Sequence, residues 1–208
     1  MRLDKFLCEM NMGTRSQVKQ LIRQKKVTVN GKISAQPDCK IDEETDQIAV
    51  EGKTVLYEKY VYFMLNKPKG VVSATEDPKE KTVLSLIPEP VREDLFPVGR
   101  LDKDTEGLLI LTNDGKLAHV LLSPKRHVDK VYRVTARNPL EASDLSKLEN
   151  GLDIGDDRLT EPAQAEIISE KELYLTIHEG RYHQVKRMFA AIDNQVVELK
   201  RVSFGGLK

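Results

Sequence analysis

Two acidic residues stand directly before an apolar run of the sequence. Asp102 and Asp104 belong to the segment GRLDKDTEGLLILTNDG, residues 99–115, and precede the run Leu108–Leu111. A carboxylate beside a buried strand costs free energy unless a cation or a hydrogen-bond donor compensates it. An Asp side chain is ionised at neutral pH and can act as a nucleophile or as an electrostatic stabiliser. The segment therefore predicts a carboxylate that is either paired for structural reasons or used in chemistry.

The segment EGRYHQVKRM, residues 179–188, can supply the compensating cation. Its spacing predicts a helix, and helical projection places Lys186 on the flank of the buried face, where its side chain can reach a cleft. His183 and Arg187 project further round, on the exposed side. We therefore expect Lys186 to be the partner of Asp102.

The composition predicts a globular chain and gives no sign of a metal site. Hydrophobic residues make up 39% and charged residues 32% of the 208 residues. No apolar run approaches the roughly 18 residues of a membrane span, and the start MRLDKF lacks the apolar core of a secretory signal. Cys8 and Cys39 stand apart from any CxxC or Cys/His cluster, so we expect reduced thiols, no metal and a cytoplasmic location.

Several enzyme classes are excluded because their motifs are missing. The sequence has no GxGxxG after a strand, no Walker loop and no GxSxG segment. These absences argue against dinucleotide-binding, nucleoside-triphosphate-binding and serine-hydrolase functions.

Charge is unevenly distributed along the chain although the formal net charge is zero. Residues 1–32 contain eight Lys or Arg and two Asp or Glu, whereas residues 33–59 contain three basic and seven acidic residues. Residues 181–208 contain six basic and two acidic residues. Two basic segments of this kind are typical of a protein that binds a nucleic acid.

The first 50 residues predict two helices followed by a hairpin. Leu3, Phe6, Leu7 and Met10 form an apolar stripe, Gly13 can end that helix, and Thr14 with Gln17 resembles a capping box for the next one. Asn30-Gly31 is a strong signal for a hairpin turn. On the second helix, Arg15, Lys19 and Arg23 recur every fourth residue and form a row on one face. Such a row suits a phosphate backbone, although a solvated helix face is the simpler interpretation.

We place a domain boundary between residues 59 and 60, where an acidic segment gives way to an apolar run. In the domain 60–208 we expect a strand, a turn and a second strand over 62–74, a strand and a helix over 108–123, a strand over 130–136, a helix over 140–152, a hairpin over 163–180, a helix over 182–192 and a strand over 195–204. Because strands and helices do not alternate strictly, we predict an α+β chain with a mixed, mostly antiparallel sheet flanked by helices.

The chain resembles two known families in consecutive parts. The pattern RLDKFL…TRSQVKQLIRQKKVTVNGK, over about the first 50 residues, is similar to S4-type RNA-binding domains. The segments NKPKG (66–70), GRLDKDTEGLLILTNDG, KVYRV (130–134) and EGRYHQVKRMF (179–189) resemble, in this order, the RsuA/RluA group of pseudouridine synthases. An S4-type domain in front of the synthase domain is the arrangement of the RsuA branch.

This resemblance implies an activity, partners and roles for single residues. It implies that Asp102 is the catalytic residue, that Tyr132 stacks on a flipped uracil, and that Lys186 orients the Asp102 carboxylate. Arg100 would fill the vacated stack or hold a phosphate. The resemblance implies further RNA contacts for Arg15, Lys19, Arg23, Lys25, Lys26, Arg181, His183 and Arg187.

The implied reaction is the conversion of a uridine of small-subunit (16S) ribosomal RNA into pseudouridine, without cofactor or metal. The implied partner is that RNA or the assembling small ribosomal subunit. The sequence has no heptad repeat and no large apolar stripe that would argue against a monomer, so we expect a monomer.

Three other functions compete with this prediction. A synthase acting on large-subunit ribosomal RNA is one, although such relatives tend to have Asn-Arg-Gln-Ile where this chain has YHQV. A non-catalytic RNA-binding protein of ribosome assembly is another. A glycoside hydrolase using Asp102 and Asp104 is the third, and we disfavour it because we expect the two carboxylates to point to opposite sides. An ordinary cap or ion pair remains the alternative for Asp102 and is favoured for Asp104.

Overall fold

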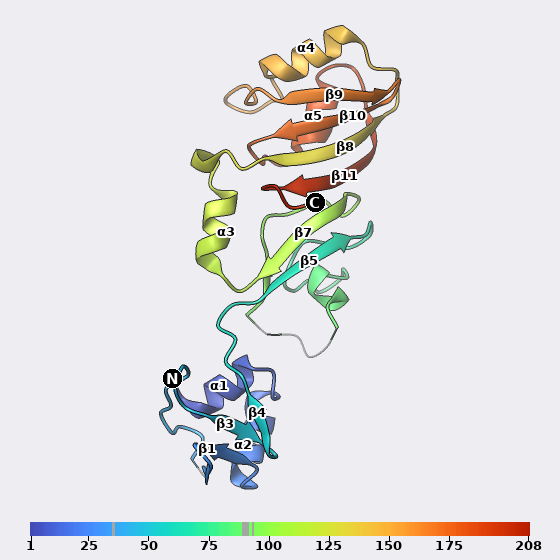
Figure 1. The fold of residues 1–208 in the computed structure, drawn as a ribbon. Coiled ribbons are helices and arrows are strands. Elements are labelled where there is room, and N and C mark those ends of the chain that lie inside the picture. The colour runs from blue at the N-terminus through green and yellow to red at the C-terminus, as the bar shows by residue number, and fades with distance from the viewer. Residues whose placement is uncertain (35, 89–91, 93) are drawn as a thin grey trace. The chain divides into compact units, whose positions relative to one another are not determined.

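The computed structural model describes residues 1–34, 36–88, 92 and 94–208, and Figure 1 shows their fold. The chain divides into two units, one comprising Met1–Val61 with Ile87–Leu95 and the other Tyr62–Leu86 with Phe96–Lys208. The boundary after Val61 lies two residues beyond the one expected from the sequence. The inclusion of a later segment in the first unit had no signal in the sequence.

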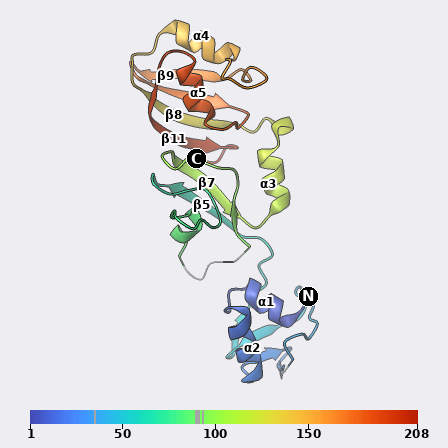
Figure 2. The same cartoon turned by 180° about the vertical axis from the view of Figure 1, so that it is seen from behind.

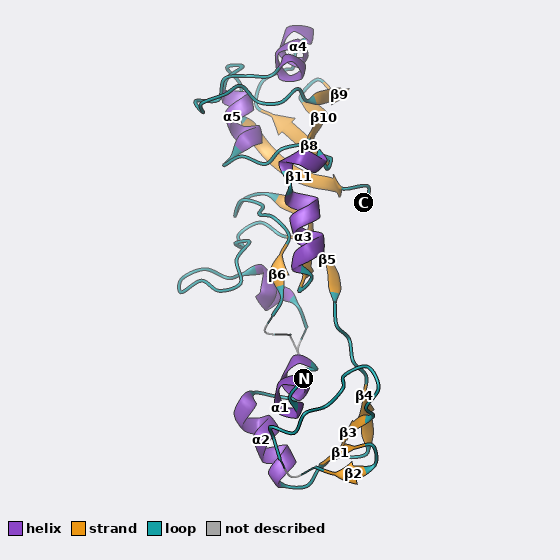
Figure 3. Cartoon of the chain, turned by 90° about the vertical axis from the view of Figure 1, so that its left-hand side faces the viewer, coloured by secondary structure: helices purple, strands orange, loops and turns teal. Residues whose placement is uncertain are grey.

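The first unit packs two helices against one side of a small sheet. Its elements are α1 (Leu3–Glu9), α2 (Arg15–Arg23), β1 (Val27–Val29), β2 (Lys32–Ile33), β3 (Ile48–Val50) and β4 (Lys53–Val55), with strand order β2-β1-β3-β4. Figure 3 shows both helices on the same side of these strands. The buried core consists of Leu3, Phe6, Leu7, Val18, Ile22, Val27, Ile41 and Ile48.

Local sequence signals account for most of this unit. The capping box of Thr14 and Gln17 is present at the start of α2. The hairpin is also confirmed, because Val29 pairs with Lys32 across Asn30-Gly31, both of which have the positive φ of a type I′ turn. The predicted end of the first helix is wrong. The helix ends at Glu9, and Asn11, which tolerates the left-handed conformation, turns the chain at φ 58° before Gly13 is reached.

The second unit is built on one mixed sheet. Its strands are β5 (Tyr62–Lys67), β6 (Phe96–Pro97), β7 (Glu106–Thr112), β8 (Lys130–Ala136), β9 (Gln164–Ser169), β10 (Glu172–Ile177) and β11 (Val196–Phe204). The order is β5-β7-β11-β8-β10-β9, with β6 paired to β7. Only the β7–β11 pair among these is parallel, so the predicted mixed, mostly antiparallel sheet is confirmed. The strand expected after NKPKG is wrong, because Val72 makes only an isolated bridge to Thr82.

The helices of this unit are α3 (Gly115–Leu122), α4 (Ala142–Asn150) and α5 (Gln184–Ala190), with 3-10 turns η1 (Val83–Leu86) and η2 (Pro124–Arg126). Figure 2 shows α5 lying across one face of β8, β10 and β11, whereas α4 lies beside β9. Along β8, alternate residues from Lys130 to Ala136 are buried. Because α5 is the helix that crosses these strands, the buried face, including Tyr132, is the α5 face.

Strand β7 carries the apolar run seen in the sequence. Leu108–Leu111 are all buried, between β5 on one side and β11 on the other. Gly107 permits the parallel pairing, because it has φ +107° and a Cβ at this position would overlap the backbone carbonyl oxygen of Arg201. The acidic segment 102–105 therefore leads directly into a buried strand that has neighbours on both sides. Of the helices in the described part of the chain, none has the length and apolarity that crossing a membrane requires.

Candidate active site

The charged groups singled out from the sequence meet at the start of β7 and the first turn of α5. Lys186 Nζ lies 3.0 Å from Asp102 Oδ2 and 2.5 Å from Asp104 Oδ1. His183 Nε2 lies 3.6 Å from Asp102 Oδ1. The predicted pairing of Lys186 with Asp102 is confirmed. The expectation that the two carboxylates point to opposite sides is wrong, because the short loop brings both onto one ammonium group.

The ion pairs keep this centre charged at neutral pH. Burial of Lys186 opposes its charge, but hydrogen bonds to Asp104 and Asp102 outweigh that effect and raise the pKa of the ammonium group. The Lys186 hydrogen bond holds the pKa of Asp104 below its ordinary value. The Asp102 and Lys186 side chains are 26% and 28% exposed, whereas Asp104 is 69% exposed. Asp102 is therefore the carboxylate that is sheltered and still reachable.

The packing of helix α5 determines the position of Lys186, because one face of the helix is buried. Val185, Met188 and Phe189 are buried, as the spacing in the sequence predicts. This leaves Lys186 at the edge of the buried face with its side chain directed to the loop 102–104. The partner of Asp102 thus comes from a residue 84 positions later in the chain.

Lys67, at the end of β5, donates hydrogen bonds to the backbone of the acidic loop 102–105. Its side chain is fully buried, and its Nζ donates to the backbone carbonyls of Thr105 (2.8 Å), Asp102 (2.9 Å), Pro68 (3.1 Å) and Lys103 (3.4 Å). Burial lowers the pKa of Lys67, and the nearby carboxylates counteract this effect. The carbonyls of Asp102 and Lys103 also accept from the amides of Thr105 and Gly70. The Thr105 carbonyl, in the buried contact, would without Lys67 face the cost of a buried acceptor that has lost its donor.

The turn after β5 fixes the other end of the loop. The Ser73 hydroxyl donates to the carbonyl of Leu101 (2.8 Å) and accepts from the amide of the same residue (3.0 Å). The Gly70 amide donates to the carbonyl of Lys103 at 2.7 Å. The segment NKPKGVVS therefore positions the backbone around Asp102 on both sides.

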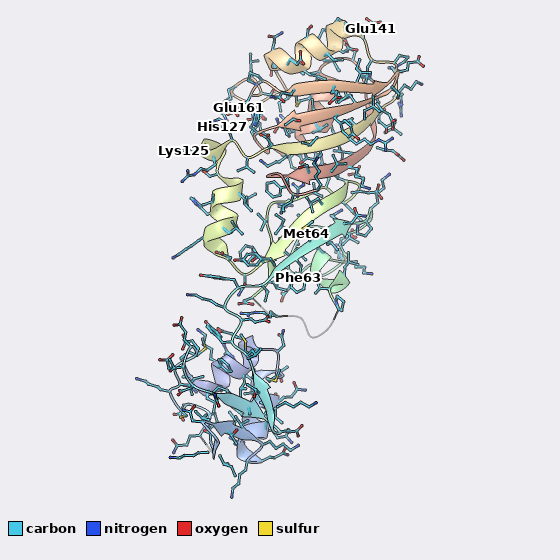
Figure 4. The ribbon with its side chains drawn as sticks, in the orientation of Figure 1. Phe63, Met64, Lys125, His127, Glu141 and Glu161 are labelled. Atoms are coloured by element: carbon cyan, nitrogen blue, oxygen red, sulfur yellow. The ribbon has the colours of Figure 1, made fainter. Side chains whose placement is uncertain are left out.

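A second network fixes the N-terminal end of α5. Glu179 is 5% exposed and accepts from Arg181 Nε (2.9 Å), Gln184 Nε2 (2.9 Å) and the amide of Glu161 (3.0 Å). Figure 4 shows Glu161 beside His127, and their side chains lie 3.6 Å apart. The loop between α4 and β9 is thereby attached both to the helix start and to the turn before β8.

Two of the cations expected to contact RNA are engaged inside the protein. Arg181, 13% exposed, also donates to the carbonyls of Arg158 and Leu159. Arg187 donates to the carbonyl of Ile154 and pairs with Asp156 at 2.5 Å. The sequence did not indicate these partners, which give both guanidinium groups a structural role. Their contact with RNA stays a prediction.

The remaining predicted residues occupy surfaces or the sheet. Tyr132 is 8% exposed on the α5 face of β8 and, among the described residues, makes no hydrogen bond with Asp102 or Lys186. Arg100 is exposed, two residues before Asp102, and no acidic side chain of the described residues pairs with it. On the first unit, Lys26 pairs with Glu51 at 2.6 Å. The other predicted RNA-contacting residues there are exposed: Arg15, Lys19, Arg23 and Lys25.

Sequence reasoning missed Lys67 and Ser73. The available signal was a lysine directly after the run YFMLN, since a lysine that becomes buried requires partners. Nothing in the local sequence identifies its partners, which lie up to 38 residues away. In the described ranges of the chain, no three His, Cys, Asp or Glu side chains converge as metal ligands would.

Comparisons with known proteins agree with the two-part organisation. A family model described as RNA pseudouridylate synthase matches residues 61–191, and one described as S4 domain matches residues 1–48. An uncharacterized RNA pseudouridine synthase of Bacillus subtilis, YtzG, is 48% identical over 99% of this chain and 88% of its own length. Ribosomal small subunit pseudouridine synthase A of Escherichia coli is 43% identical over 100% and 90%, respectively. A solved structure of a pseudouridylate synthase, 42% identical, has a TM-score of 0.68 and covers 99% of this chain and 89% of that one.

Replacing Lys67 tests the support of the acidic loop. Lys67→Met removes the donor shared by four backbone carbonyls, so we expect the free energy of unfolding in urea to fall by about 1–3 kcal/mol. Lys69→Met is the matched control, because Lys69 is exposed and, among the described residues, pairs only with Glu198 at 3.7 Å. We expect that control to change stability by less than about 0.5 kcal/mol. Equal stabilities of the two variants would contradict the role of Lys67.

Proposed function

Because the chain belongs to the RNA pseudouridine synthase family, we propose that it converts a specific uridine of 16S ribosomal RNA into pseudouridine, with Asp102 as catalytic residue. The matches to the two family models and to an RNA pseudouridine synthase support an RNA-modifying isomerase with an N-terminal S4 domain. The choice of small-subunit RNA is supported by the similarity, across the whole chain, to small-subunit synthases of several bacteria.

The observation that carries the assignment of Asp102 is its ion pair with Lys186. The carboxylate is sheltered, paired with a cation and attached to a loop whose backbone is fixed by Lys67 and Ser73. Such preorganisation lets a charged group act on a substrate without first reorganising its surroundings. Asp104 shares the same ammonium group but is mostly exposed, so the proposal gives it a supporting electrostatic role.

The reaction needs only a rearrangement within the nucleotide, and the proposal includes no cofactor. The bond from N1 of uracil to C1′ of ribose breaks, the base rotates, and a bond from C5 to C1′ forms. C5 then loses a proton and N1 gains one, so that atoms and charge balance. A carboxylate can act as a nucleophile on the sugar carbon or as a base toward the proton at C5, and the proposal assigns this step to Asp102.

The target base must leave its helical stack before Asp102 can reach it. Tyr132, on the α5 face of β8, is the proposed stacking partner of the flipped uracil. Arg100 is exposed near Asp102 and is proposed to fill the vacated stack or to hold a phosphate.

The S4 domain is proposed to supply the electrostatic part of RNA binding. Arg15, Lys19 and Arg23 are exposed on α2, and none of them forms an ion pair with the described acidic residues. Free cations in a row release counterions from a phosphate backbone on binding, which gives affinity that depends on salt.

Substitution of the central carboxylate tests the chemistry. Asp102→Asn removes the charge at nearly constant size, so we expect no detectable pseudouridine while the Kd for the RNA changes less than threefold. The release of tritium from 5-tritiated uridine in a 16S transcript measures the reaction, because C5 loses its hydrogen. Asp104→Asn is the matched control and should retain activity within about tenfold.

Activity of Asp102→Asn equal to that of the wild type would overturn the catalytic assignment. Mapping pseudouridine in ribosomal RNA from cells with and without this chain tests the substrate separately. Loss of a modified position from large-subunit RNA only would reject the proposed target and leave the reaction type intact.

Salt titration tests the S4 domain. Lys19→Gln with Arg23→Gln should weaken binding to the transcript and reduce the slope of log Kd against log salt by about 1.4–1.8, since each of the two phosphate contacts contributes about 0.7–0.9. Lys147→Gln with Lys171→Gln removes the same charge from the second unit and should leave the slope unchanged. Equal slopes for the two double variants would contradict the proposed role of α2.

A further inference from the structure

An exposed aromatic ring is stacked on His183, which lies beside Asp102, and the proposed reaction does not use it. Tyr182 is 76% exposed, more than any other large hydrophobic residue described. Its ring is stacked on the ring of His183, with centroids 3.9 Å apart and planes inclined by 17°. In the described part of the chain no other ring or cation stacks on Tyr182, so its second face is open to solvent.

The backbone holds this stack in a strained conformation. His183 has φ +49°, in the left-handed region, which costs a residue other than glycine free energy and persists only where its surroundings impose it. The surroundings are specific here: Arg187 Nη1 donates to the carbonyl of Tyr182 at 3.1 Å, and the Arg181 amide donates to Gln184 Oε1 at 3.0 Å. The network around Glu179 and Asp156 therefore fixes the position of the two rings.

The stack connects the open surface to the candidate catalytic carboxylate. The inner ring, His183, places Nε2 3.6 Å from Asp102 Oδ1. The outer ring, Tyr182, is stacked on the face of the same imidazole. A planar group placed on the free face of Tyr182 would continue the same stack, two layers removed from the imidazole.

We propose that the free face of Tyr182 binds a nucleobase adjacent to the target uridine in the substrate RNA. This inference rests on the proposed function and adds a specificity-determining contact to it. The flipped uracil itself belongs near Asp102 and the buried Tyr132, so the exposed ring takes a base that stays outside the pocket. Stacking suits this position because every nucleobase offers a π face.

The test uses a synthetic RNA hairpin that contains the uridine modified by the wild-type chain. Tyr182→Ala should raise the Kd for this hairpin by about 5- to 150-fold, whereas Tyr182→Phe, which keeps the ring, should stay within twofold. The rate of the bound complex should change less than threefold. Tyr174→Ala is the matched control, because Tyr174 is a 37% exposed tyrosine on the opposite face of the sheet, and it should leave the Kd unchanged.

A base-specific readout separates stacking from a general structural effect. 2-Aminopurine is placed on the 5′ or the 3′ side of the target uridine, and its fluorescence falls when it stacks on an aromatic ring. We expect quenching at one of these positions with wild type and Tyr182→Phe, and loss of that quenching with Tyr182→Ala. Removing the same base from the hairpin should weaken wild-type binding and leave Tyr182→Ala binding unaffected.

The outcomes distinguish this inference from the proposed function. If the wild-type chain forms pseudouridine but Tyr182→Ala matches it in Kd and in fluorescence at both positions, the stacking proposal is wrong. Additive effects of the abasic site and Tyr182→Ala would reject it as well. If the wild-type chain forms no pseudouridine in any ribosomal RNA, the proposed function fails and this inference falls with it.

Discussion

The ammonium group of Lys186 lies between two carboxylates, and the larger unit is arranged around that contact. An ionised Asp102 next to the buried strand β7 requires a compensating cation. The cation comes from α5, which is fixed by its apolar face on the sheet and by the carboxylates of Glu179 and Asp156 at its start. The position of a helix late in the chain thus determines whether an early loop can hold a reactive charge.

The same loop is constrained a second time through its backbone. Lys67 and Ser73 bind the main chain from Leu101 to Thr105, so the Asp102 side chain extends from a fixed support. The two constraints differ in kind. Lys186 compensates charge and can act during the reaction, whereas Lys67 is buried under the loop and can only position it. This division explains why one lysine is partly exposed and the other fully buried.

Local patterns in the sequence predict a large part of this arrangement. The spacing of Val185, Met188 and Phe189 gives the helix and puts Lys186 at the edge of its buried face, and Asn30-Gly31 gives the hairpin of the first unit. The pairing of Lys186 with Asp102 was the long-range contact that such patterns indicated, and other long-range partners were beyond them. The charges of Arg181 and Arg187 are visible in the sequence, but several of the groups that engage them belong to a loop more than 20 residues away. These groups are the carbonyls of Ile154, Arg158 and Leu159 and the carboxylate of Asp156.

The most direct test of the central ion pair is the single-turnover rate of pseudouridine formation by variants of Lys186. Lys186→Met leaves Asp102 without its cation, and we expect the rate to fall by about 100-fold or more while the Kd for RNA stays within threefold. Lys186→Arg keeps a cation at this position and should recover most of the rate. A Lys186→Met protein as fast as the wild type would contradict the dependence of Asp102 on this contact.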